Sequence, residues 1–143
     1  DFEFNASFYY IFREIGYLFS GYNEISFIGR TTPILTVLFL LYLTFFRRNK
    51  TFIQLITAML FGLCFYYFTA TTVHPWYLAT PLILCVFTNY KFPVIWSLVI
   101  ILAYQAYANN PWEENLWFVF IEYLIVFSFF IYEILNQLKM KKF

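Results

Sequence analysis

Charged residues are scarce in this sequence. Only 12% of its 143 residues are charged, whereas a soluble domain carries about 25%. Nine basic residues nearly balance eight acidic ones, so no nucleic-acid partner is expected, and no block of like charge marks a disordered tail. Because 62% of the residues are hydrophobic and they form long apolar runs, the composition is typical of a protein that crosses a membrane several times.

Residues that bind metals or form disulfides are also rare. The two cysteines, Cys64 and Cys85, fall inside apolar runs, where a thiol packs as a small apolar side chain. Their spacing matches no metal site, and the single histidine, His74, excludes a site with several histidine ligands. The sequence contains no Gly-rich phosphate loop and no local Ser/His/Asp signature. We therefore expect no metal site and no cofactor.

The start of the chain suggests a larger protein. It begins at Asp1, without an initiator methionine and without the basic, apolar and small-residue pattern of a signal peptide. We therefore expect residues 1–143 to be a fragment, a single transmembrane domain from the C-terminal part of a longer chain.

Five apolar segments are long enough, or nearly so, to cross the roughly 30 Å hydrocarbon core of a bilayer. They cover residues 32–46 (or from Ile25), 52–70, 76–90, 93–108 and 116–135. The third and fourth are short and only Lys91 and Phe92 separate them, so a tight helical hairpin is the alternative to two crossings. A backbone in lipid must satisfy its own hydrogen bonds, which favours helices. The predicted fold is an all-α bundle of about five transmembrane helices over residues 31–143.

The first 30 residues are expected to form an interfacial segment outside the membrane. Between Ser7 and Phe19, four large apolar residues recur at helical spacing, while Arg13 and Glu14 fall on the other flank. This pattern predicts an amphipathic helix lying in the interface, with Asn5 or Ser7 as its N-cap. The acidic and amide residues before it, Asp1, Glu3 and Asn5, are read as a solvated loop.

Basic residues predict the orientation. Seven of the nine basic residues follow the first, third and fifth segments, namely Arg47, Arg48, Lys50, Lys91, Lys139, Lys141 and Lys142. With five crossings these clusters lie on one side, which the positive-inside rule makes cytoplasmic. The N-terminus, His74 and the loop around Pro111 then face the outside, and the C-terminus is cytoplasmic. We expect an integral membrane protein, and the resemblance described below implies a bacterial inner membrane.

His74 opens the third segment, in the sequence Thr71 to Ala79. Pro75 is favoured in the first turn of a helix, and a helix N-terminus attracts phosphate. The imidazole can donate hydrogen bonds or move a proton, and Trp76 and Tyr77 suit headgroup depth. This pattern predicts a site for the phosphate of a lipid-linked substrate. The alternative is a histidine that merely lies at the interface between aromatic residues.

Three further residues are candidates for the same cavity. Glu122 lies within the fifth segment, where a carboxylate is costly and faces protein or water. Arg30, His74 or a tyrosine hydroxyl are its expected partners, and a structural hydrogen bond between helices is the alternative to a functional role. Arg30 could bind a phosphate bidentately, and Tyr123 follows Glu122. Glu133, near the cytoplasmic end, is assigned no role.

Four short motifs resemble a known family. Phe2-Glu3-Phe4-Asn5-Ala6-Ser7-Phe8-Tyr9 precedes the first span, and Thr72-Val73-His74-Pro75-Trp76-Tyr77-Leu78 opens an external helix. Trp96-Ser97 begins a span that ends at Tyr104 to Tyr107, and the last helix contains Trp117 and Glu122-Tyr123. Together they resemble the C-terminal half of integral-membrane glycosyltransferases of the GT-C type, in particular the bacterial polyprenyl-phosphate-mannose-dependent mannosyltransferase-like proteins. The resemblance spans nearly the whole chain, although Ile125 and Val126 stand where the family often has a proline.

The resemblance implies transfer of a sugar, mannose in that family, from a polyprenyl-phosphate donor to a lipid or glycan acceptor at the external membrane face. The catalytic acidic loop of that family lies near the N-terminus of the full protein, so no catalytic residue is expected in this fragment. The site residues then bind the donor: His74 at the lipid phosphate, with Trp76, Tyr77, Arg30, Glu122 and Tyr123 lining the cavity. The expected partners are membrane lipid, the lipid-linked donor and the missing N-terminal part of the protein.

Two other hypotheses remain open. The missing acidic loop and the many aromatic residues are also compatible with a non-catalytic membrane subunit or a lipid-binding scaffold. A transporter or flippase would use Glu122 and His74 as a proton relay, but such proteins have helices broken by Gly or Pro at the substrate site. Pro81 is the one such break noted in these segments.

Overall fold

The computed structural model of this protein describes residues 3–140, and every regular element in that range is helical, with one isolated β-bridge. The all-α prediction is therefore confirmed. Asp1, Lys141 and Lys142, which entered the predictions above, lie outside the described residues. The chain divides between His74 and Pro75 into two compact units, which are described separately.

The first unit begins with the expected amphipathic helix. Helix α1 spans Phe8–Ser20 and ends at Gly21, whose φ of 74° is one that glycine adopts readily. Ser7 occupies the N-cap position, but its side chain makes no capping hydrogen bond. Leu18 and Phe19 are more than four-fifths exposed, as expected for a helix whose apolar face meets lipid instead of a protein core.

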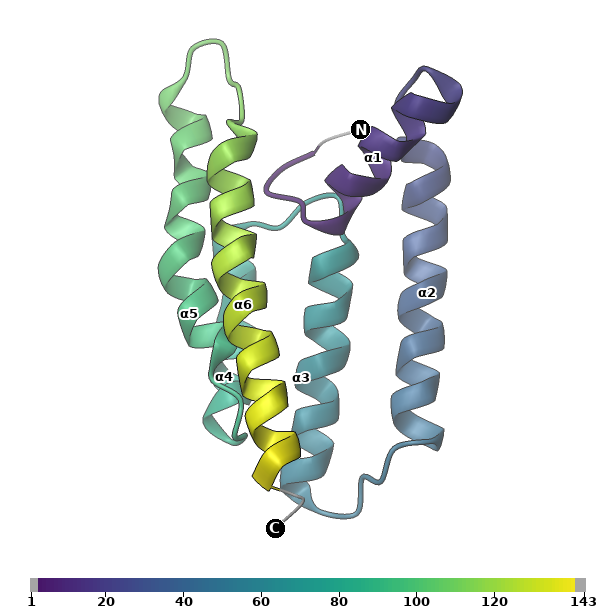
Figure 1. The fold of residues 1–143 in the computed structure, drawn as a ribbon, viewed down its shortest axis with the longest axis vertical. Helices are drawn as coiled ribbons and strands as arrows, with labels where there is room; N and C mark the ends of the chain where they lie inside the picture. Colours follow the sequence, from purple (N-terminus) through teal and green to yellow (C-terminus); the bar gives the residue numbers. More distant parts are fainter. Residues whose placement is uncertain (1–2, 141–143) are drawn as a thin grey trace. The chain divides into compact units, whose positions relative to one another are not determined.

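Helices α2 (Ile25–Phe45) and α3 (Phe52–Thr69) run antiparallel beside each other, and α1 lies at the end where α2 begins and α3 ends (Figure 1). Gly62 lies at their contact, where a Cβ atom would come within 2.5 Å of Cδ2 of Leu40 and require that side chain to shift. Small residues permit such contacts between membrane helices. At the opposite end, Thr51 and Gln54 form a capping box that starts α3 directly after the first basic cluster.

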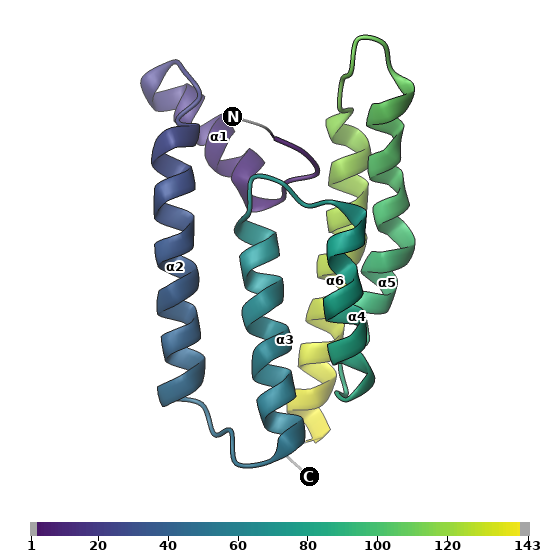
Figure 2. The same cartoon turned by 180° about the vertical axis from the view of Figure 1, so that it is seen from behind.

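The second unit is built around α6 (Leu116–Met140), with α5 (Phe92–Val99) packed along it (Figure 2). A 3₁₀ turn, Pro75–Leu78, leads into α4 (Ala79–Val86), and α5 continues as a 3₁₀ helix over Ile100–Ala108. Trp96, Ile100 and Val126 are among the buried side chains of this unit.

Three helices in the described part of the chain, α2, α3 and α6, are long and apolar enough to cross a membrane. The predicted third and fourth spans form shorter apolar helical stretches, Pro75–Val86 and Phe92–Ala108. The first of these stretches combines a 3₁₀ turn with the eight residues of α4 and reaches only roughly 20 Å. The structure therefore supports a membrane protein in which three helices are long enough to span, with the two shorter stretches joined as a hairpin. Five crossings, and the orientation derived from them, remain predictions.

Candidate functional site

The segment Glu3–Ser7 is held against the loop that precedes His74. The backbone N–H of Phe4 donates to the carbonyl of Thr71 at 3.1 Å, and that of Val73 donates to the carbonyl of Phe4 at 2.9 Å. Residues 4–7 are buried, and Asn5 adopts a φ of 48°, which asparagine tolerates better than most residues. The expected solvated loop is therefore wrong here, because backbone pairing with a loop far along the chain draws these residues inward.

Glu3 is the centre of a hydrogen-bonded network on α1 and the α1–α2 turn. Its carboxylate accepts from the hydroxyl of Tyr9 at 2.5 Å and from the amide of Asn23 at 2.6 Å. Arg13 donates to the other oxygen at 2.6 Å and also pairs with Glu14 at 3.0 Å.

This network determines the charge on Glu3. Burial alone raises the pKa of the carboxyl, but hydrogen bonds from Tyr9, Asn23 and Arg13 and the charge of Arg13 outweigh it, so the pKa lies below its usual 4.5. Burial and the neighbouring carboxylate raise the pKa of Tyr9, which therefore stays protonated as a donor. Glu3 is thus an anion held in a fixed position.

His74 lies at the end of the same loop, with its ring 5.1 Å from that of Phe4 between centroids, at a tilt of 31°. Burial lowers the pKa of His74 below 6.5. Its imidazole is therefore neutral at pH 7, with one nitrogen as donor and the other as acceptor. The structure thus brings together two of the motifs noted in the sequence, the one around Phe4 and the one around His74.

Trp76 and Tyr77 lie in the 3₁₀ turn Pro75–Leu78 and their rings meet edge to face at 6.2 Å. Trp76 is 59% exposed, as suits an interfacial anchor. The α-helix that was predicted to start at Pro75 begins only at Ala79. The phosphate-attracting N–H groups of an α-helix N-terminus are therefore displaced from His74 by the 3₁₀ turn.

Arg30 lies exposed on α2. It is two residues from Ile28, which is buried against α1, so it projects from the other side of the helix. The structure brings none of the other predicted site residues of the first unit to it, and in the described part of the chain it forms no ion pair.

Glu122 is fully buried in α6, and its carboxylate accepts a hydrogen bond from the indole N–H of Trp96 on α5 at 2.9 Å. Tyr123 packs edge to face on the Trp96 ring at 5.8 Å. Glu122 and Tyr123 thus join a helix–helix contact within the second unit. The expected partners of Glu122 did not include Trp96, whose position on α5 could not be read from the sequence.

Glu133 has a role that the sequence did not indicate. Its two carboxylate oxygens accept the backbone N–H groups of Lys91 and Phe92, at 2.7 and 2.9 Å, where α5 begins. The ammonium of Lys91 donates to the carbonyls of Cys85 and Thr88, at 2.8 and 2.9 Å, where α4 ends. The two residues therefore satisfy exposed helix ends and stabilise the hairpin. The one feature of the sequence that could have indicated this role is the presence of a carboxylate, Glu133, in an otherwise apolar helix.

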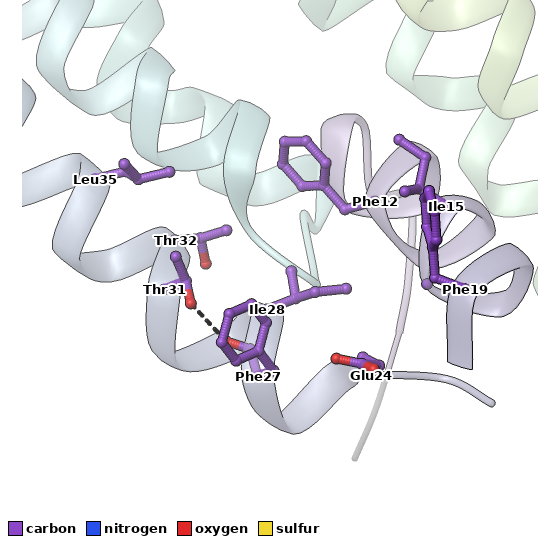
Figure 3. Close-up of a pocket in the computed structure, with 10 residues that line it drawn as sticks. Phe12, Ile15, Phe19, Glu24, Phe27, Ile28, Thr31, Thr32 and Leu35 are labelled. Carbon is purple, nitrogen blue, oxygen red and sulfur yellow. Dashed lines mark hydrogen bonds between the residues drawn. The ribbon is translucent and has the colours of Figure 1, made fainter. Parts of the chain in front are cut away.

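An apolar groove of about 360 Å³ runs between α1 and α2 (Figure 3). Phe12, Ile15 and Phe19 contribute from α1, and Phe27, Ile28 and Leu35 from α2. Among the residues that line it, Glu24 is the only charged one. In the described residues, no group of three or more His, Cys, Asp or Glu side chains is placed to hold a metal.

Comparisons with known proteins do not assign this chain to a family. No protein-family model, no curated protein and no solved structure matches this chain. The function is therefore inferred from the residues and their arrangement.

Proposed function

We propose that this chain is the C-terminal membrane part of a glycosyltransferase of the GT-C type. It would move a sugar, mannose in the family it resembles, from a polyprenyl-phosphate donor to a lipid or glycan acceptor at the external membrane face. The observation that supports this proposal is the backbone pairing of Phe4 with Thr71 and Val73. It joins two of the four motifs that carry the resemblance, among them the more specific one around His74.

The paired segments provide a rigid surface of irregular backbone where α1 begins and α3 ends. Such backbone is tolerated at membrane depth only where protein or water satisfies it, and binding residues are often found on loops held by a rigid scaffold. Here the buried Phe4 supports the ring of His74, and the Glu3 network fixes the segment to α1. His74 is therefore positioned by its surroundings, as a binding residue requires.

In the proposed reaction the bond between the anomeric carbon and the lipid-phosphate oxygen breaks, and a new bond forms to an acceptor hydroxyl. The neutral imidazole of His74 would donate one hydrogen bond to a phosphate oxygen, an interaction stronger than one between neutral groups. The proton of the acceptor hydroxyl would pass to a carboxylate in the acidic loop of the missing N-terminal part. Trp76 and Tyr77 would lie at the headgroup level beside the donor.

The test is sugar transfer by the intact protein in liposomes supplied with a polyprenyl-phosphate-linked sugar. His74→Ala should lower kcat/KM by about tenfold to a hundredfold, the effect of losing a hydrogen bond to a charged group. His74→Gln, which keeps an N–H donor, should retain more activity. Tyr104→Ala, which removes an exposed ring from the second unit, serves as the control. Unchanged transfer by folded His74→Ala would contradict the role of His74.

The second candidate function is a non-catalytic subunit or lipid-binding scaffold, and the groove between α1 and α2 favours it. A scaffold would show no transfer or donor hydrolysis in any variant, and it would copurify in fixed ratio with another membrane protein. Measurable transfer by the wild-type protein, lost in His74→Ala, would exclude this alternative.

A further inference from the structure

The groove between α1 and α2 has dimensions that match one leaflet of a bilayer. Its α2 wall extends from Glu24, the N-cap, to Leu35. Eleven residue steps at about 1.5 Å each make this wall about 16 Å long. Half of the roughly 30 Å hydrocarbon core is about 15 Å. The groove is therefore long enough to hold a hydrocarbon chain over a length comparable to one leaflet.

The groove opens between apolar, exposed helix faces. Helix α2 is long and apolar enough to span the membrane, and most of its side chains are exposed. Phe27, on the rim of the groove, is 65% exposed, and Phe19 on the facing helix is 88% exposed. Aromatic side chains this exposed on two adjacent membrane-facing helices leave the groove accessible to lipid chains.

The volume and the lining indicate what fits. About 360 Å³ is near the lower end of the range for small-molecule pockets, about 300–1,000 Å³, which suits one hydrocarbon chain better than two. Thr31 donates its hydroxyl to the carbonyl of Phe27 at 2.9 Å (Figure 3), so this donor is already used within the helix. Gly16 lies in the α1 wall next to the charged end of the groove, since an added Cβ would make ordinary van der Waals contact with Cβ and Cγ of Glu24, both 3.6 Å away.

The charge lies at one end of the groove. Glu24 precedes the first residue of α2, and Figure 3 shows it on the connection between the two helices. It is the only charged residue of the lining, so a phosphate beside it would be repelled and an ammonium attracted. An occupant with a hydrocarbon chain along α2 and a cationic group beside Glu24 is complementary to this arrangement.

We propose that this groove binds one acyl chain of a phospholipid with an ammonium headgroup, such as phosphatidylethanolamine, with the ammonium beside Glu24. The site holds a lipid of the surrounding membrane, and it exists whether or not the protein transfers a sugar. It would fix α1 to the start of α2 by filling the space between them.

The test is photolabelling of the full-length protein in phosphatidylcholine vesicles. One sample contains phosphatidylethanolamine with a photoreactive diazirine on its acyl chain, and a second contains phosphatidylglycerol with the same chain. Adducts are mapped to peptides by mass spectrometry. Labelling should concentrate between Phe12 and Leu35 above the level on α6, which samples bulk lipid. It should be about two- to fivefold stronger with phosphatidylethanolamine, the gain expected of an exposed ion pair.

Two pairs of variants separate the chain from the headgroup. Gly16→Leu should fill the groove and reduce labelling there to the α6 level, while Gly29→Leu, whose position has open space around it, should label like wild type. Glu24→Gln should make the two lipids label equally, while Glu113→Gln in the loop before α6 should not. If Gly16→Leu fails to fold, Gly16→Ala should give the same loss in smaller measure.

Three results would overturn the proposal. Labelling between Phe12 and Leu35 no higher than on α6 would mean that another part of the protein fills the groove. Unchanged labelling of folded Gly16→Leu would place the lipid elsewhere. Equal labelling by the two lipids in the wild type would remove the assigned role of Glu24.

Discussion

The two units hold their carboxylates in different ways. In the first unit, the partly exposed Glu3 lies beside the amphipathic helix α1 and pairs with the guanidinium of Arg13 as well as with neutral donors. In the second unit, Glu122 and Glu133 lie on α6, and their donors include an indole N–H and two backbone N–H groups. A charged donor is readily accommodated at the partly exposed Glu3, whereas a charge brought to the fully buried Glu122 must itself be desolvated.

The carboxylates of the two units therefore have different structural roles. Glu133 satisfies the start of α5, whose N–H groups carry the partial positive charge of a helix N-terminus. Lys91 directs its charge to the carbonyls at the end of α4, which is the complementary match. The Glu3 network instead fixes a chain segment against a helix. The second unit therefore uses carboxylates to complete helices, and the first uses one to position a loop.

Replacing Glu133 by leucine should have the greatest effect on stability. It leaves the buried backbone N–H of Phe92 without its acceptor, at about 1–3 kcal/mol, and the partly buried N–H of Lys91, at about 1 kcal/mol. The free energy of unfolding in bicelles should therefore fall by roughly 2–4 kcal/mol. Glu113→Leu, in the exposed loop before α6, is the matched control and should change little. A Glu133→Leu protein as stable as wild type would show that these N–H groups find another acceptor.

Trp96→Phe should have the next largest effect. The ring is retained but the N–H that reaches Glu122 is lost, which should cost about 1.5–3 kcal/mol of unfolding free energy. Trp117→Phe changes an indole that is 73% exposed and should be nearly neutral. Combining Trp96→Phe with Glu122→Leu should cost less than the sum of the two single changes, because the two side chains interact. Additive effects would indicate that the hydrogen bond contributes nothing.

Glu3→Gln should have a smaller effect, and one that depends on pH. The folded-state pKa of Glu3 lies below 4.5, so the ionised network contributes stability above the unfolded pKa and loses it as the pH falls through the folded value. Unfolding measured between pH 7 and pH 3 should show this loss in the wild type and a weaker dependence in Glu3→Gln. At pH 7 the variant should be less stable by about 1 kcal/mol. Parallel pH curves would contradict the network.

The smallest effect concerns the charge of His74. Burial lowers its pKa below 6.5, so the neutral ring is favoured by folding and stability declines as the pH falls below the unfolded value. Since the chain has a single histidine, NMR titration of its imidazole is unambiguous and should give a midpoint below 6.5. Phe4→Ala should move the midpoint toward that value by exposing the ring. A wild-type midpoint above 6.5 would indicate an anionic neighbour.

Helix type and the amphipathic character of the N-terminal segment could be predicted from hydropathy and spacing alone. Residues 7–19 and α1 agree closely, because a stripe of apolar residues at helical spacing is a local property. For the third and fourth apolar segments, the sequence does not distinguish a membrane span from a shorter buried helix. Their apolar composition indicates lipid or a protein core equally well. At the end of α4, the Lys91 ammonium and the Thr88 hydroxyl both donate to the carbonyl of Cys85, and the ammonium also donates to that of Thr88.

The candidate site shows the same limit. His74 was singled out by its uniqueness and its setting, both of which are visible in the sequence. The pairing of Phe4 with Thr71 and Val73 was not visible, because backbone hydrogen bonds leave little trace in side-chain identity. The sequence likewise predicts a solvated loop at Glu3. In the fold, however, the side chains of Tyr9, Arg13 and Asn23 donate hydrogen bonds to it.

Composition and hydropathy were thus sufficient to predict a helical protein with helices apolar enough to span a membrane and an amphipathic N-terminal helix, since apolar length and spacing are properties of each segment separately. The partners of Glu3, Glu122 and Glu133, and the groove between α1 and α2, depended on the tertiary structure. Each requires groups from segments distant in the sequence or from two packed helices, and a hydrogen bond forms only when packing brings its donor and acceptor within about 3 Å.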